Sequence, residues 1–183
     1  MRNLFILFFV FIFISCGDDV LPKPKGYLNL KYPKNSYVKL DLKRPYSFSI
    51  SKAAITIDEK NNWLKIKYPK LKASIDITYR PVKNNLKELL IESEKLVFEH
   101  TVKADQISSN NFLNKDKKVF GTVHEITGNA ASQIQFHATD STKHFIKGAL
   151  FFYTKPNYDS ILPAVNYIKK DIATIMVSLE WKK

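Results

Sequence analysis

Residues 63–79 read WLKIKYPKLKASIDITY and contain two short stretches in which apolar and polar residues alternate. In the first stretch Leu64, Ile66 and Tyr68 alternate with lysines, and residues 73–79 repeat the pattern after a Pro-Lys break. A period of two is typical of a β-strand with one buried face and one wet face. The two stretches therefore predict an antiparallel hairpin near the start of the folded domain.

The same pattern predicts further strands on both sides of this hairpin. These strands are expected at residues 46–50, 53–58, 119–127, 132–138 and 144–153. Residues 105–116 are rich in Asn and Ser, so we expect a loop there.

Two helices are predicted from apolar residues that recur at spacings of three and four. The first begins at Asn84 or Asn85 and runs to about Ala104, and the second closes the chain after a cap at Asp159 or Ser160. The order strands, helix, strands, helix predicts an α+β fold, an antiparallel sheet with packed helices. In element order this outline is similar to the PsbP-like α/β/α sandwich.

The composition indicates one globular domain with a basic surface. The chain has 183 residues, 45% of them hydrophobic, with a net charge of +12. Its lysines are scattered through nearly every segment, which favours a general surface field over a clustered nucleic-acid footprint. We expect a single α+β domain over residues 46–183.

The amino-terminal segment predicts a signal peptide over residues 1–15. A positively charged start precedes residues 4–14, which carry no charge. Eleven residues rise about 16 Å as a helix, roughly half of the hydrocarbon thickness of a bilayer. A permanent transmembrane anchor is therefore the weaker interpretation.

Residues 13–16, Phe-Ile-Ser-Cys, resemble the bacterial lipobox, although Phe13 replaces the usual Leu. Lipidation at Cys16, with acyl chains such as palmitate, would anchor the chain in a membrane. Cys16 is the only cysteine, so it can form no disulfide within the chain. The following Gly-Asp-Asp resembles a surface-export signal, which leaves both the periplasmic face and the cell surface open.

Residues 16–45 are rich in proline and lysine, which favours an extended tether and arm over a helix. Tyr27, Tyr32 and Tyr37 make this arm too apolar for a purely solvated linker. They are candidate partner or ligand contacts, and packing onto their own domain is the alternative. Trp63, Lys65 and Lys67 are further candidates for such contacts, with a solvated lysine face as the alternative. An export signal conflicts with nucleic-acid binding.

No catalytic motif is present. The sequence has no HExxH, no GxSxG and no glycine-rich phosphate loop, so we assign no catalytic residue, no metal and no cofactor. His124, His137 and His144 lie on or beside adjacent predicted strands and could meet in space. We expect them to be ordinary strand histidines.

Several runs of the sequence resemble the gliding-motility lipoprotein family GldD of Bacteroidetes. They are residues 16–28, 32–33, 45–48, 63–69, 73–79, 128–136 and the closing helix as far as Trp181. The resemblance implies a lipid-anchored envelope protein needed for gliding and associated with the gliding and type IX secretion apparatus. It supplies no catalytic residue.

We therefore expect a non-enzymatic accessory or scaffold lipoprotein. Its expected partners are envelope proteins of the gliding and secretion machinery and the membrane, most simply the outer membrane. The alternative is an envelope glycan-binding or small-ligand-binding domain.

Overall fold

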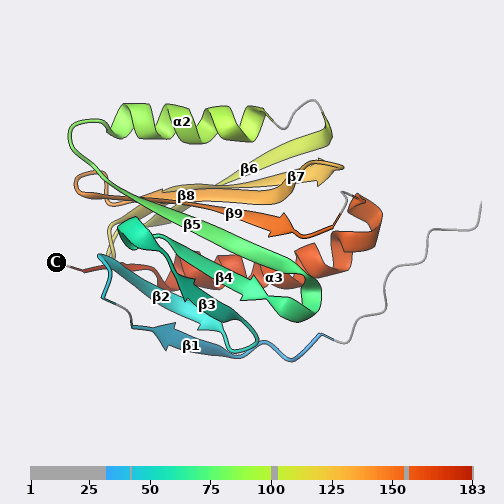
Figure 1. Cartoon of the computed structure of the whole chain (residues 1–183). Coiled ribbons are helices and arrows are strands. Elements are labelled where there is room, and N and C mark those ends of the chain that lie inside the picture. Colours follow the sequence, from blue (N-terminus) through green and yellow to red (C-terminus); the bar gives the residue numbers. More distant parts are fainter. Residues whose placement is uncertain (1–31, 42, 100–102, 155–156, 183) are drawn as a thin grey trace, which may run out of the picture.

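The computed structural model describes residues 32–41, 43–99, 103–154 and 157–182 (Figure 1). The predicted signal peptide, Cys16 and Tyr27 lie outside this part of the chain. The strands are β1 Tyr37–Leu40, β2 Tyr46–Ser51, β3 Ile55–Asp58, β4 Leu64–Tyr68, β5 Ala73–Pro81, β6 Ala104–Asn114, β7 Val119–Gly128, β8 Ser132–Thr139, β9 His144–Phe152 and β10 Glu180–Trp181. The helices are α2 Leu86–Phe98 and α3 Tyr158–Ser178, with short 3-10 turns η2 Lys60–Asn62 and η3 Pro69–Leu71.

Two antiparallel sheets organise the described residues. One has seven strands in the order β3-β4-β5-β9-β8-β7-β6, and the other has the order β1-β2-β10. Figure 1 shows α2 and α3 on opposite faces of the seven-stranded sheet. The predicted α+β class with antiparallel strands and packed helices is confirmed, while the likeness to the PsbP fold stays a prediction.

The hairpin predicted from residues 63–79 forms as β4 and β5. Leu64 pairs with Ile77 and Ile66 with Ile75, and all four side chains are fully buried. They belong to the same core as the apolar face of α3. Burying each such side chain contributes about 1.5–3 kcal/mol to the stability of the fold.

The loop predicted at residues 105–116 is wrong, because this segment forms β6. Its residues pair with β7 from Ala104↔Gly128 to Asn114↔Val119. β6 is an edge strand and most of its side chains are exposed, so it carries no apolar alternation. Cross-strand pairing overrides the low strand propensity of Asn and Ser.

The predicted first helix is also too long at its carboxyl end. α2 ends at Phe98, and by Ala104 the chain is already in β6. Asn85 is the residue before the helix, but its side chain accepts a hydrogen bond from the Lys83 amide rather than from the helix. The pairing of β6 with β7 requires the chain to leave the helix before Ala104.

Asp171, a buried carboxylate in the middle of α3, holds the arm onto the domain. The Tyr37 hydroxyl donates to Asp171 Oδ1 at 3.0 Å and the Asn35 amide at 3.3 Å, while the Tyr68 hydroxyl donates to Oδ2 at 2.9 Å. Burial raises the pKa of Asp171, and the hydrogen bonds from Tyr68, Tyr37, Asn35 and Ser51 partly offset this effect. The end of the arm is thus fixed to a core helix.

This raised pKa predicts a pH-dependent contribution to stability. Unfolded Asp171 ionises near the ordinary pKa of 3.8, whereas the folded protein keeps the proton to higher pH. Its contribution is complete below 3.8 and is lost as the pH rises through the folded pKa. The unfolding free energy of the wild type minus that of Asp171→Asn should therefore fall between pH 3.8 and neutrality. Urea titrations across this range measure it, and a difference that rises with pH contradicts the assignment.

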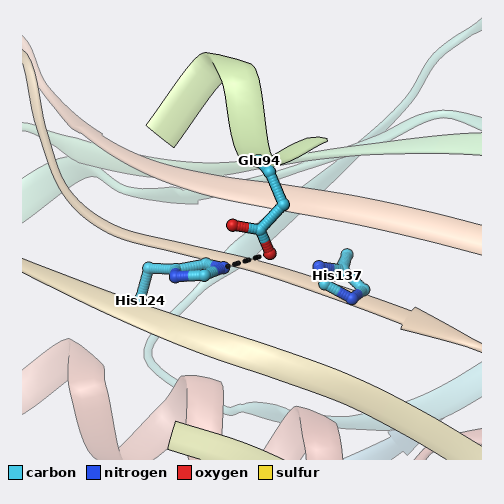
Figure 2. A group of neighbouring side chains, drawn as sticks. All are labelled: Glu94, His124 and His137. Atoms are coloured by element: carbon cyan, nitrogen blue, oxygen red, sulfur yellow. Dashed lines mark ion pairs between the residues drawn. The ribbon is translucent and has the colours of Figure 1, made fainter. Parts of the chain in front are cut away.

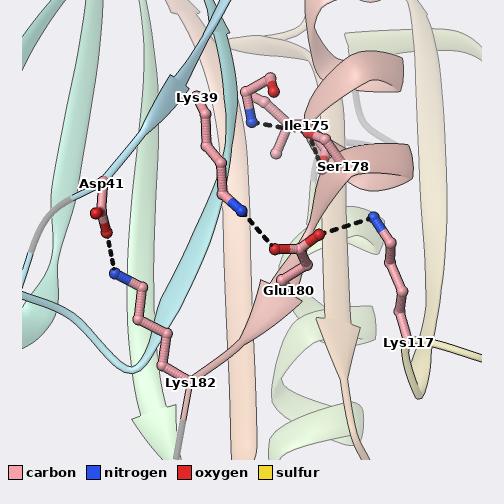
Figure 3. A network of polar contacts seen from close by, with 8 residues as sticks. Lys39, Asp41, Lys117, Ile175, Ser178, Glu180 and Lys182 are labelled. Carbon is pink, nitrogen blue, oxygen red and sulfur yellow. Dashed lines mark hydrogen bonds and ion pairs between the residues drawn. The ribbon is translucent and has the colours of Figure 1, made fainter.

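The carboxyl end of the chain completes the small sheet. Glu180 and Trp181 of β10 pair with Ser47 and Tyr46 of β2. Figure 3 shows Glu180 between the ammonium groups of Lys39 and Lys117 and, nearby, the ion pair of Asp41 with Lys182. The Glu180 carboxylate lies 2.8 Å from Lys39 Nζ and 3.2 Å from Lys117 Nζ. These exposed pairs contribute little to stability, but they join β1, β10 and the β6–β7 turn on one surface.

Candidate functional site

Buried polar side chains gather between α2 and the large sheet. α2 buries Leu89, Ser93 and Val97, a narrow stripe. Beneath it, His124 of β7 and His137 of β8 are both buried. The core on the α3 side is built mainly of apolar side chains, so the α2 side is the place where chemistry can be concentrated.

Three side chains converge there from three different elements (Figure 2). His124 Nε2 lies 3.5 Å from Glu94 Oε1, and one ligand atom each of Glu94, His124 and His137 lies within 4.8 Å of the others. The two rings come together because His124 and His137 lie on one face of paired strands, two positions apart in register. We refer to Glu94, His124 and His137 as the histidine cluster.

Both imidazoles of the histidine cluster are held in the neutral form. Burial lowers the pKa of His124, and the nearby Glu94 carboxylate partly offsets the shift. Burial, reinforced by His124, lowers the pKa of His137 to about 4. The Ser109 hydroxyl lies 2.8 Å from His124 Nδ1, and the Ser93 hydroxyl lies 3.5 Å from His137 Nδ1. His124 Nε2 is buried without a hydrogen-bond partner in the described structure.

The sequence suggested that three histidines could meet, and the structure brings two of them together. His144 instead lies apart from the histidine cluster, with its Nδ1 2.9 Å from the Tyr79 hydroxyl and its ring stacked on Trp181 at 5.3 Å. Glu94 was missed by sequence reasoning. The sequence feature that could have pointed to Glu94 is its neighbour Ser93, a polar residue on the apolar stripe of the helix.

Trp63 precedes β4, and Lys65 and Lys67 lie within it. Because the three occupy alternate positions, they lie on the same face of the strand. Lys65 is neutralised by Asp76 at 3.2 Å and Glu59 at 3.7 Å. A lysine paired twice offers little free charge to an anionic ligand, which weakens the case for this face. As contact residues these three stay a prediction.

Two of the arm tyrosines contact their own domain. Tyr32 packs against the ring of Tyr167, with 5.0 Å between the ring centroids, and Tyr37 donates to Asp171. A groove of about 310 Å³ lies beside Tyr32, and its lining includes Leu71 and Phe152. This volume is at the lower end of small-ligand pockets, so the alternative of a ligand-binding domain also stays a prediction.

In the described residues, neither helix has the length and apolar character that crossing a bilayer requires. No curated protein matches the chain. The model of one family, the gliding motility lipoprotein GldD, matches residues 17–181, which include every described strand and both described helices. The match supports the resemblance read from the sequence, and it begins at the residue after Cys16. The chain therefore belongs to the gliding motility lipoprotein GldD family.

Proposed function

We propose that the chain is a non-enzymatic accessory or scaffold component of the gliding and type IX secretion apparatus, held at the outer membrane by acyl chains on Cys16. The observation that carries the proposal is the family match over residues 17–181, directly after a lone cysteine in a lipobox-like sequence. A lipoprotein family implies a lipid anchor and association with the cell envelope. Several acyl chains exceed the threshold for durable anchoring.

Exposed strand edges support a role in binding other proteins. β3 and β6 end the large sheet, and they expose Ile55 and Leu113 by 57% and 62%. An edge strand presents unpaired backbone groups to which a partner can add a strand. A scaffold protein needs such surfaces and no catalytic group.

Lipidation predicts a complete change of partitioning in Cys16→Ala. Native membranes should yield wild-type protein that carries acyl mass and enters the detergent phase, whereas Cys16→Ala should be unmodified and stay in the aqueous phase. Ser15→Ala is the matched control, because alanine keeps a small residue at the cleavage position and should leave both readouts unchanged. Intact mass and detergent partitioning measure the result. An unmodified, water-soluble wild type would remove the anchor from the proposal.

The role in motility is tested by removing the chain from gliding cells. Cells without it should stop gliding or fail to export adhesins, and the wild-type gene should restore both. Cross-linking of the restored protein should recover envelope proteins of the apparatus. Unimpaired gliding and adhesin export in the deletion strain would contradict the proposal.

A further inference from the structure

The histidine cluster has a geometry that its own side chains do not explain. His124 is 2% exposed, and its Nε2 has no hydrogen-bond partner in the described structure. Leaving a buried polar atom unpaired costs about 1–3 kcal/mol. When His124 donates its Nδ1 proton to the Ser109 hydroxyl, the lone pair of Nε2 faces the Glu94 carboxylate. Two electron-rich groups that face each other are stabilised by a cation between them.

The spacing of these two groups fits a tetrahedral metal ion. Two ligands that each lie about 2.1 Å from an ion are about 3.4 Å apart in a tetrahedral site and about 3.0 Å apart in an octahedral one. The observed separation of His124 Nε2 and Glu94 Oε1 is 3.5 Å. An adjustment of the His137 ring, whose ligand atom lies within 4.8 Å of the others, completes the set.

The donor set selects the class of metal. Imidazole nitrogen suits zinc and other late transition metals, whereas calcium and magnesium require oxygen ligands. We propose that Glu94, His124 and His137 bind one zinc ion, which connects α2 to β7 and β8. Three protein ligands leave a fourth position for water, and the Glu94 side chain is 42% exposed, so solvent reaches the ion from the helix side.

The surroundings are suited to such a site. Ser109 Oγ orients His124 in the way that outer partners orient metal-bound histidines. Lys147, the cross-strand neighbour of His137, lines one surface depression together with Glu92.

Zinc would also strengthen the attachment of α2 to the sheet. Because the helix buries few apolar side chains, it gains less from packing than α3 does. A metal that binds the folded state stabilises it in proportion to its affinity and concentration. Zinc at this site therefore stabilises the packing of α2 on the sheet.

The test uses the full chain in detergent, stripped of metal with EDTA and then titrated with Zn²⁺. We expect one zinc per chain by elemental analysis after gel filtration, a higher Tm with Zn²⁺, and no such effect with Mg²⁺. Glu94→Gln, on the exposed side of the helix, should keep the fold and weaken zinc binding by at least about tenfold. His124→Gln and His137→Gln should lose it.

Two control variants keep the result specific. Glu92→Gln changes a carboxylate on the same helix outside the histidine cluster, and His144→Gln removes a histidine that lies apart from it. Both should bind one zinc with wild-type affinity. Failure of the wild type to bind zinc overturns the proposal, and so does stoichiometric binding that Glu94→Gln leaves unchanged. Circular dichroism of each metal-free variant identifies any that has not folded, and Glu94→Gln then carries the test.

Discussion

Asp171→Ala is expected to lower the free energy of unfolding by about 3 kcal/mol and to release the end of the arm. The substitution removes the acceptor of three hydrogen bonds, from Asn35, Tyr37 and Tyr68. The Tyr68 hydroxyl is buried and loses its partner, and an unsatisfied buried donor costs about 1–3 kcal/mol. The remainder comes from the lost contacts of the arm. Urea denaturation measures the total.

Release of the arm has its own readout. Lys34 and Lys39 lie on either side of Tyr37, so trypsin should cut there faster in Asp171→Ala than in the wild type. Lys170→Ala, one residue away on the exposed side of α3, is the control and should change neither stability nor cleavage. Equal cleavage rates in wild type and Asp171→Ala would show that the arm is held by other contacts.

Gly148→Ala is expected to destabilise the protein by about 1–3 kcal/mol through a steric clash in the core. Phe136 pairs with Gly148 across β8 and β9, and its ring covers the position where a side chain would begin. A Cβ at Gly148 would lie 2.2 Å from Phe136 Cζ. Phe136→Ala should cost more, about 3–5 kcal/mol, because it empties this space.

A double-mutant cycle checks that these two residues act as one packing unit. Phe136→Leu removes the far end of the ring, so Gly148→Ala should cost clearly less in that background than in the wild type. Thermal and urea unfolding of the four proteins measure the coupling. Additive losses would mean that Gly148 is required for another reason.

Strand alternation in the sequence was sufficient to predict the centre of the fold. In β4 the buried residues recur at every second position, and Leu64, Ile66 and Tyr68 join the core that contains the apolar face of α3. β6 could not be predicted from alternation, because an edge strand whose two faces are both exposed to solvent has no apolar pattern. β10 is two residues long, and only its pairing with β2 makes it a strand.

The polar sites were harder to predict because they depend on contacts distant in sequence. Glu94 meets His124 and His137 only because α2 packs over their two strands, and the two histidines follow Glu94 in the sequence by 30 and 43 residues. Asp171 was visible as a charge on the apolar stripe of α3, three residues after Ile168, but nothing in the sequence names its donors. Periodicity in the sequence shows which face of a helix or strand is buried, but it does not identify the residues that contact this face.

The docking of the arm determines how tension would pass from the membrane into the domain. Within the described residues, force applied at a lipid anchor reaches Tyr32, which packs on Tyr167, before it reaches Asn35 and Tyr37 on α3 and the β1–β2 ladder beside them. Such a load is thus divided between a helix and a strand pair. The first structure to yield under load should be this joint, well before the seven-stranded sheet.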